Sequence, residues 1–294
     1  MKKWISMLLV IILVISIVGC SKEESITIAS KPMTEQFIIA EMITALIEQE
    51  TDLTIKYKAG IGGGTANIHP AMMKGEIDIY PEYTGTGWME VLKQDLINNP
   101  EELYKAVKKS YSEEFNIYWS NLYGFNDTFG LAMKKELAKE LNIKTYSDLA
   151  TISEDLTFGA EHDFFEREDG ILGLNEIYGM SFGKEVGMDI GLKYSAINSG
   201  EVDVINIFST DGKLEEYNLL VLEDDLNFFP SYFAATLVRQ EVLDSHPELV
   251  SVLGLLDGVI SNDEMTIMNY KVEIEKQEPG KVAREFLQEK GILN

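Results

Sequence analysis

One segment of the sequence occurs twice, and this repeat constrains the fold more than any other feature. The segments AMMKGEIDIYPEYTGTG (71–87) and AINSGEVDVINIFSTDG (196–212) align without gaps. Each copy predicts the end of a helix, a glycine that stops it, a short strand and a turn. In the first copy we expect the strand over 75–79, with Tyr83 in the turn that follows it. The repeat therefore predicts two similar lobes, with chance similarity of a single helix–strand unit as the alternative.

Helices and strands alternate along the chain. The hydrophobic pattern predicts a strand over 26–30, a helix over 34–50 with Thr34 as its N-cap, and a second strand over 53–60. This alternation is typical of an α/β fold with a largely parallel sheet. In such sheets, ligands bind beyond the carboxyl ends of the strands.

Two stretches rich in aromatic residues, Asn, Asp and Pro interrupt the regular segments, at 121–133 and 223–238. We expect the chain to pass from one lobe to the other near residue 126 and to return near residue 233. The expected lobes are lobe I, formed by 26–126 and 234–294, and lobe II, formed by 127–233. Two lobes joined by two hinge crossings leave a cleft, which is a common way to enclose a small solute.

The N-terminal segment predicts export and a lipid anchor. Residues 1–19 have two lysines followed by an apolar run, which is typical of a signal peptide and too short for a stable membrane span. The segment SIVGC resembles a lipobox, with Ile17 in place of the usual leucine. Cys20 is the only cysteine in the chain, so it cannot form an internal disulfide. We expect lipid on Cys20 to attach the protein to the membrane, and residues 20–25 to form a tether.

Composition and motifs argue against several classes of function. The formal net charge of -24 disfavours binding to nucleic acid, which needs a basic surface. The three histidines lie far apart without metal-ligand spacing, and no nucleophile elbow is present. The glycine-rich segment 60–69 lacks the GK[ST] of a phosphate-binding loop, so we expect a tight turn into a helix there. These features predict a protein that is not an enzyme and has no metal and no cofactor.

Four aromatic residues stand at strand ends and crossings. Tyr83 and Phe208 occupy the same place in the two repeats, and Phe129 and Tyr232 lie at the two crossings. Each ring alone would be typical of a hydrophobic core. Rings from both lobes can instead surround a quaternary ammonium ion, which each π face attracts by about 0.5–2 kcal/mol.

Six motifs carry a resemblance to a known family. In order along the chain they are SKPMTEQFIIAEM, KGEIDIYPEYTGTG, GFNDTFGLAM, STDGKL, NFFPSYFAATLVR and ISNDEMTIMNYKV. The chain resembles the glycine betaine/carnitine/choline family of ABC-transporter substrate-binding lipoproteins over about residues 26–290. The resemblance implies a two-lobed periplasmic-binding-protein fold (type II) that closes over a quaternary ammonium compound in an aromatic box.

The resemblance also implies roles for particular residues. Tyr83 and Tyr232 match tyrosines of the aromatic box, whereas Phe129 and Phe208 stand where tyrosine is common, so this cage lacks two hydroxyl groups. The missing hydroxyls imply a shift in preference toward a bulkier or more apolar cation.

A carboxylate-binding group is expected at the other end of the ligand. Lys31 follows the first strand and precedes a helix N-terminus, a place suited to an anion. Betaine-binding relatives have a similar lysine, a threonine like Thr86 and an arginine like Arg167, whereas choline-specific relatives tend to have an aspartate at the position of Thr86. We further expect Asp127 to order the cage and the hinge, and Asp163 to pair with Arg167 one helical turn away.

Together these expectations describe an extracytoplasmic receptor on the outer face of the cell membrane. It would deliver a carboxylated, glycine betaine-like osmolyte to an ABC permease and its ATPase subunit. A protein of the same fold that prefers choline or carnitine is the nearest alternative. A sensory receptor and a lipoprotein enzyme are more distant alternatives.

Overall fold

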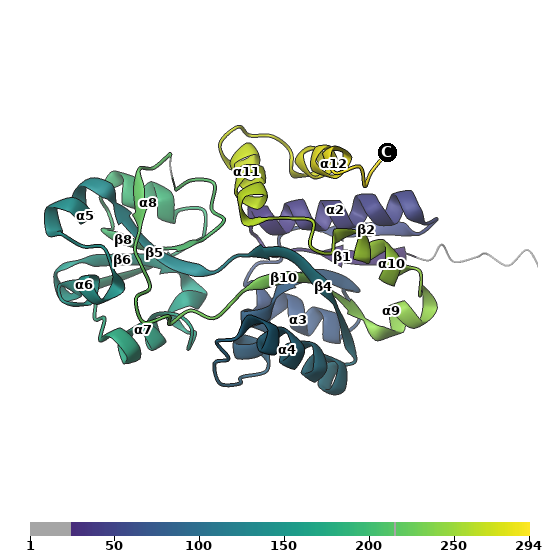
Figure 1. The fold of residues 1–294 in the computed structure, drawn as a ribbon, viewed down its shortest axis with the longest axis horizontal. Helices are drawn as coiled ribbons and strands as arrows, with labels where there is room; N and C mark the ends of the chain where they lie inside the picture. The colour runs from purple at the N-terminus through teal and green to yellow at the C-terminus, as the bar shows by residue number, and fades with distance from the viewer. Residues whose placement is uncertain (1–24, 215) are drawn as a thin grey trace, which may run out of the picture.

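The computed structural model describes residues 25–214 and 216–294, which form two α/β bodies, each built on one five-stranded sheet (Figure 1). The predicted signal peptide and Cys20 lie outside the described residues. The sheet of the first lobe has the order β2 (Thr54–Lys58), β1 (Ser25–Ala29), β3 (Ile79–Tyr83), β10 (Phe233–Arg239) and β4 (Ile117–Asn126). The sheet of the second lobe has the order β7 (Lys184–Met188), β6 (Thr157–Glu161), β8 (Val204–Phe208), β5 (Phe129–Lys134) and β9 (Leu219–Val221).

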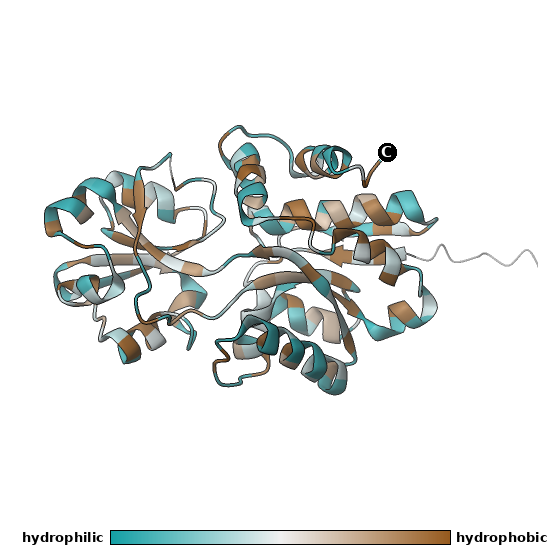
Figure 2. Cartoon of the chain, in the orientation of Figure 1, coloured by the Kyte–Doolittle hydropathy of each residue, from teal (hydrophilic) through white to brown (hydrophobic). Residues whose placement is uncertain are grey.

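The helices cover both sheets. Those of the first lobe are α2 (Thr34–Glu50), α3 (Thr65–Met73), the π-helical η1 (Thr86–Val91), α4 (Pro100–Phe115), α9 (Gln240–Ser245), α10 (Leu249–Leu253), η4 (Gly254–Leu256), α11 (Asn262–Glu273) and α12 (Pro279–Glu289). Those of the second lobe are α5 (Lys135–Leu141), α6 (Tyr146–Ala150), η2 (Ser153–Asp155), η3 (His162–Phe165), α7 (Ile171–Tyr178) and α8 (Lys193–Ser199). Helices α10, α11 and α12 pack on α2. Hydrophobic residues gather on the strands of both sheets, whereas α4 and α5 are largely hydrophilic (Figure 2).

The two copies of the repeat adopt the same structure up to the ends of their strands, as predicted, but differ after them. Helical residues that include η1 follow β3 directly, whereas a turn follows β8. β3 and β8 are the equivalent central strands, and the glycine before each has a left-handed backbone, with φ of +73° at Gly75 and +75° at Gly200. The aspartate before each strand makes the same contact. Asp78 accepts a hydrogen bond from the Thr27 backbone N–H at 2.9 Å, and Asp203 accepts one from that of Thr157 at 2.8 Å.

Three local predictions differ from the structure. The strand expected over 75–79 lies at Ile79–Tyr83, so Tyr83 is the last residue of β3 rather than a turn residue. All five residues of β3 are buried, and the alternating pattern just before it belongs to a turn. Thr34 is not the N-cap of α2, because Met33 holds the extended backbone of the cap position. Each sheet is mixed rather than largely parallel, since β10 and β5 run antiparallel to their neighbours.

Two segments connect the sheets. β4 ends at Asn126 and β5 begins at Phe129, while β9 ends at Val221 and β10 begins at Phe233. The segments lie side by side, because the Asp127 N–H donates to the Tyr232 carbonyl oxygen at 3.1 Å. This arrangement has the two crossings of a hinged, two-lobed protein. The lobe boundaries at 126/127 and 233/234 stay predictions.

Candidate ligand-binding site

A cavity of about 520 Å³ lies between the two sheets, and both lobes contribute to its walls. Its lining includes all nine residues singled out for the ligand site from the sequence. They are Lys31, Tyr83, Thr86, Asp127, Phe129, Asp163, Arg167, Phe208 and Tyr232. Their binding roles stay predictions, but the fold brings them together from positions far apart in the sequence.

Three of the four aromatic rings form one wall of the cavity. Phe129 at the start of β5 is the register partner of Phe208 at the end of β8, and their ring centroids are 5.1 Å apart. Tyr232 meets Phe129 edge to face at 5.3 Å. Tyr83 comes from the end of β3 in the other lobe, and its hydroxyl donates to Glu35 at 2.6 Å. The four rings at the cavity thus come from both lobes, as the predicted cage requires.

Protein cations already face three of these rings. Lys31 Nζ lies 4.9 Å from the centroid of Tyr83, and Lys193 Nζ lies 4.5 Å from that of Phe208. The guanidinium carbon of Arg167 lies 5.2 Å from the centroid of Phe129. These distances are within the range of cation–π attraction. A ligand cation therefore has to use the opposite ring faces or displace these side chains.

Lys31 forms a buried ion pair with Glu82, which the sequence did not suggest. Glu82 is fully buried on β3 and also accepts hydrogen bonds from Thr65 Oγ1 at 2.9 Å and from the Tyr83 N–H at 2.8 Å. Burial lowers the pKa of Lys31, although Glu82 opposes that effect. Two hydrogen bonds thus hold Glu82 in place, and Glu82 in turn holds the ammonium end of Lys31.

Arg167 pairs with Asp169, whereas the pairing of Arg167 with Asp163 stays a prediction. Arg167 Nε and Nη2 donate to the two oxygens of Asp169 at 2.7 and 2.6 Å. The helical turn η3 ends at Phe165, so residues 163 and 167 do not lie on one helix face. Burial opposes the charge of Arg167, but Asp169 outweighs burial and raises the pKa of Arg167. Asp169 also accepts a hydrogen bond from the Tyr232 hydroxyl at 2.6 Å, so one carboxylate holds both the Arg167 guanidinium and the Tyr232 ring.

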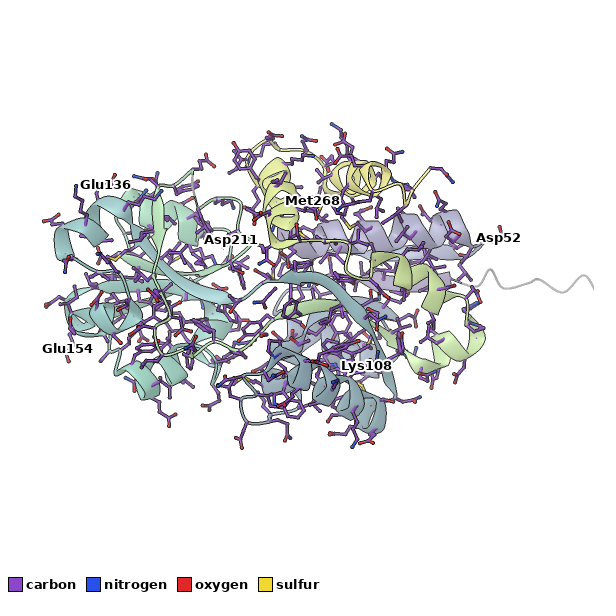
Figure 3. The ribbon with its side chains drawn as sticks, in the orientation of Figure 1. Asp52, Lys108, Glu136, Glu154, Asp211 and Met268 are labelled. Atoms are coloured by element: carbon purple, nitrogen blue, oxygen red, sulfur yellow. The ribbon has the colours of Figure 1, made fainter. Side chains whose placement is uncertain are left out.

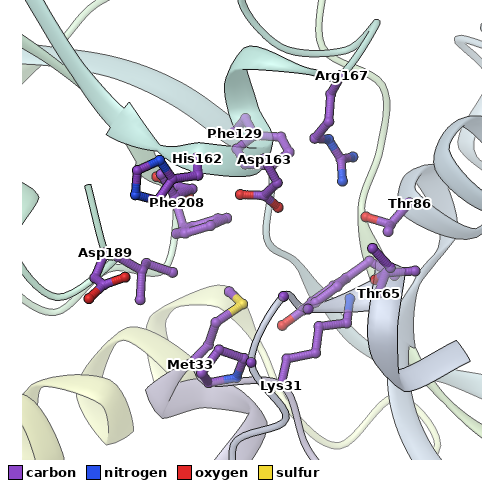
Figure 4. Close-up of a pocket in the computed structure, with 18 of the residues that line it drawn as sticks. Lys31, Met33, Thr65, Thr86, Phe129, His162, Asp163, Arg167, Asp189 and Phe208 are labelled. Carbon is purple, nitrogen blue, oxygen red and sulfur yellow. The ribbon is translucent and has the colours of Figure 1, made fainter. Parts of the chain in front are cut away.

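The predicted carboxylate-binding residues converge on one side of the cavity. Lys31 from the first lobe and Arg167 from the second point toward the region beside Thr86 (Figure 4). Thr86 is the first residue of η1, and it is buried. His162 and Asp189 lie at the other end of the cavity (Figure 4). The cavity therefore has a cationic end and a separate end that no sequence motif indicated.

Acidic residues outnumber basic ones in the cavity wall. Its five carboxyl groups belong to Asp127, Glu161, Asp163, Glu166 and Asp189, and its lysine and arginine are Lys31 and Arg167. Glu161 lies 3.5 Å from Lys193, and burial raises its pKa while Lys193 lowers it. The balance of charge favours a ligand with a positive group.

The glycine-rich segment enters a helix, as expected, but it also borders the cavity. Gly64 precedes α3 with a φ of +54°, and residues 62–66 line the cavity wall. Within the described residues, no group of three or more His, Cys, Asp and Glu side chains is placed to hold a metal ion.

Close backbone approach at Gly85 sets the position of Tyr232. A Cβ on Gly85 would lie 2.7 Å from Cε1 of Tyr232 and 2.9 Å from the Ser231 carbonyl oxygen. We expect Gly85→Ala to displace the Tyr232 ring and to cost about 1–3 kcal/mol of folding stability, as overpacking does. Urea unfolding measures this cost, and calorimetry measures the accompanying loss of ligand affinity. Gly254→Ala is the matched control, since its Cβ would meet only Asp257 Oδ2, at 3.6 Å. Equal effects of the two substitutions would contradict the role of Gly85.

Comparison with known proteins identifies the family. The model of the substrate-binding domain of ABC-type glycine betaine transport systems matches residues 24–289. The chain belongs to this family. It is 42% identical over 271 residues to the ergothioneine transport permease/ergothioneine binding protein EgtU of Helicobacter pylori (strain G27), a match that covers 92% of this chain and 48% of that protein. The chain thus spans about half the length of that relative.

Two further matches cover nearly the whole of both chains. The carnitine transport binding protein OpuCC of Listeria monocytogenes is 36% identical, with 98% of this chain and 96% of that protein covered. The crystal structure of a glycine betaine/carnitine/choline ABC transporter protein superposes with a TM-score of 0.74 at 34% identity, covering 92% of this chain and 100% of that one. The resemblance found in the sequence is confirmed. Residues 24–289 are thus a substrate-binding domain of the family found in ABC-type glycine betaine transport systems.

The comparisons also bear on location and on catalysis. The relatives named above are transport proteins rather than enzymes, and the family is one of extracytoplasmic binding proteins. Within residues 25–214 and 216–294, no helix combines the length and apolar character needed to cross a membrane.

Proposed function

We propose that this protein binds a carboxylated quaternary ammonium compound between its lobes and delivers it to an ABC permease and its ATPase. The observation that carries the proposal is the cavity itself. Aromatic rings from both lobes face it, a lysine and an arginine converge at one end, and its wall is acidic on balance. A lipid on Cys20 would keep the protein at the outer face of the membrane.

The cage accounts for the cationic end of the ligand. A quaternary ammonium ion has no N–H to donate, so it cannot be held by hydrogen bonds. Aromatic faces and nearby carboxylates attract its diffuse charge instead. Tyr83 from the first lobe and Phe129, Phe208 and Tyr232 from the second lobe and its crossing supply those faces. Closure then follows from contacts that form only when both lobes touch the ligand.

Hydrogen-bond capacity supports the carboxylate end. An arginine has five N–H donors, and Arg167 directs two of them at Asp169. A lysine has three donors, and Lys31 directs one at Glu82. Both side chains keep donors for a ligand carboxylate, with the hydroxyl of Thr86 nearby. Their own carboxylate partners hold them in place and reduce the net positive charge of this end, so directed hydrogen bonds matter more here than long-range attraction.

A second observation favours a betaine larger than glycine betaine. The cavity extends past the cage to His162, Met188, Asp189 and Ile190. Its volume of about 520 Å³ suits a ligand that has another group in addition to the ammonium and the carboxylate. The relative that is 42% identical is named for ergothioneine, a betaine with a sulfur-bearing ring. Ergothioneine is therefore the second candidate beside a glycine betaine-like osmolyte.

Calorimetric titration of the purified protein with glycine betaine, carnitine, ergothioneine and choline tests the proposal. We expect one betaine to bind with a stoichiometry of one, and choline to bind at least about tenfold more weakly, since it lacks the carboxylate. Preference for choline would support the aromatic cage but would contradict the carboxylate-binding roles proposed for Lys31 and Arg167. Absence of binding by all four compounds would refute the proposed ligand class.

A further inference from the structure

A chain of buried hydrogen bonds runs behind the cage from one lobe to the other. It begins at the Tyr83 hydroxyl, which donates to Glu35 Oε1 at 2.6 Å. Glu35 Oε2 lies 2.6 Å from Thr210 Oγ1, which lies 2.8 Å from Asp127 Oδ1. Glu35 is on α2 of the first lobe, Thr210 follows β8 of the second lobe, and Asp127 is in a crossing segment. None of the four side chains belongs to a residue more than 4% exposed.

The hydroxyl of Thr210 cannot satisfy two ionised carboxylates. A threonine hydroxyl has one hydrogen to donate, and an ionised carboxylate can only accept. If Glu35 and Asp127 were both ionised, one of the two short oxygen–oxygen contacts would have no hydrogen in it. A buried contact of that kind is repulsive and costly. One proton on either carboxyl group completes the chain, because that group then donates to Thr210 and Thr210 donates to the other.

We propose that Glu35 and Asp127 share one proton through Thr210, and that this proton positions Tyr83 and ties the two lobes together. Ligand binding is then linked to proton uptake, a consequence that rests on the proposed function. Glu35 and Thr210 act as positioning residues, since they reach the ligand site through Tyr83 and Asp127.

The surroundings of the pair favour the proton. Burial raises the pKa of Glu35 to about 7. Burial, and next the charge of Glu35, raises the pKa of Asp127 well above its usual range. Asp211 adds a third carboxylate, and it accepts hydrogen bonds from Tyr194 Oη and from the Phe208 N–H. Asp211 lies where the two lobes face one another (Figure 3).

Nearby cations have carboxylate partners of their own. A smaller cavity of about 130 Å³ adjoins the pair and is lined by Lys193 and Lys213. Lys193 lies 3.5 Å from Glu161, and Lys213 lies 3.9 Å from Glu273. Asn269 of α11 also faces the pair, and its amide donates to the Thr210 carbonyl oxygen at 2.9 Å. No ion pair between a cation and Glu35 or Asp127 occurs in the described part of the chain.

The direction of the pH dependence follows from the proton count. Above about pH 5 the unfolded chain holds no proton on either group, because free Glu and Asp titrate near pH 4. The native pair keeps one proton up to its midpoint, near pH 7 or above. Over this interval the native state holds the extra proton, so its stability falls as the pH rises, and it falls no further above the midpoint.

Comparison of the full-length protein with Glu35→Gln tests the shared proton without a ligand. The amide that this substitution introduces would donate to Thr210 permanently and still accept from Tyr83. We expect urea unfolding to show that the folding equilibrium constant of the unsubstituted protein falls, relative to that of the variant, as the pH rises from 5 to 8. The fall should reach up to about tenfold per pH unit below the midpoint. Glu50→Gln, at the exposed end of the same helix, is the control. Its folding equilibrium constant should depend on pH in the same way as that of the unsubstituted protein.

A constant ratio between the protein and Glu35→Gln across this range would overturn the shared proton. Should Glu35→Gln fail to fold, Asp127→Asn supplies the same donor from the other side of Thr210 and gives the same stability test.

Calorimetry at pH 6 and pH 8 tests the link to binding. With the tightest compound of the betaine panel, the unsubstituted protein should lose affinity at pH 8 by up to about tenfold per pH unit above the midpoint, because only the protonated fraction is competent. The affinity of Glu35→Gln should change less. Equal pH profiles of affinity would remove the link to binding. If no compound binds at either pH, the proposed function fails, and the unfolding data still decide whether the proton is shared.

Discussion

Asp169→Ala is expected to lower the free energy of unfolding by about 3–5 kcal/mol, since breaking a buried ion pair leaves the other charge uncompensated. The side chains of Arg167 and Asp169 are 7% and 2% exposed, so water does little to replace the lost partner. The substitution also removes the acceptor of the Tyr232 hydroxyl. One substitution therefore disturbs a cage ring and an arginine of the proposed carboxylate site together, and we expect ligand affinity to fall as well.

Urea unfolding measures the loss of stability, and a matched substitution shows its cause. Asp169→Asn keeps the shape and one acceptor oxygen and should have an intermediate effect. Glu101→Ala breaks the exposed pair with Lys105 and should cost no more than about 1 kcal/mol. A cost for Asp169→Ala as small as that for Glu101→Ala would show that Asp169 does not hold Arg167.

Phe129→Ala is expected to have a comparable effect, of about 3–5 kcal/mol in stability, as is usual for removing a large buried ring. Phe129 is the ring at the centre of the aromatic wall of the cavity. It packs against Phe208, Tyr232, Phe164 and Phe229 at centroid distances of 5.1 to 5.9 Å. Its loss would free the neighbouring rings to move, and the ligand would have one π face fewer to contact.

Phe129→Leu separates these two contributions, because leucine keeps much of the apolar volume and has no π face. We expect the leucine variant to lose about 0.5–2 kcal/mol of affinity for a quaternary ammonium ligand. Phe129→Tyr, which keeps the π face, is the control for affinity. If calorimetry gave the same affinity for the leucine and tyrosine variants, Phe129 would not be a cage residue.

Local signals in the sequence were sufficient to predict the architecture. The repeat at 71–87 and 196–212 predicted two similar units, and these units contain the equivalent strands β3 and β8. The aromatic stretches contain the crossings, although much of each stretch is regular, since residues 121–126 and 129–133 lie in β4 and β5 and residues 233–238 lie in β10. Alternation misplaced β3, since all residues of that central strand are buried and one of them, Pro81, disfavours a central strand.

The partners of the site residues were not predictable in the same way. Glu35 and Thr210 touch across 175 residues of sequence, and only the assembled fold brings them together. Glu82 was missed because the strand was expected over 75–79, which left Glu82 outside it, whereas Glu82 lies in the fully buried strand β3, where an acidic side chain needs a partner. Asp169 lies only two residues after Arg167, but acidic residues are so frequent in this chain that its position alone singles out nothing.

The most direct test of the account uses two ligands that differ in a single atom. The first is the betaine that binds most tightly in the panel, and the second is its isostere in which a neutral carbon replaces the quaternary nitrogen. Calorimetry should show the isostere binding more weakly by about 2 kcal/mol or more, because several rings lose the charge that they attract. Equal affinity for the two compounds would mean that the rings recognise shape alone, and it would contradict the cation cage on which the proposed function rests.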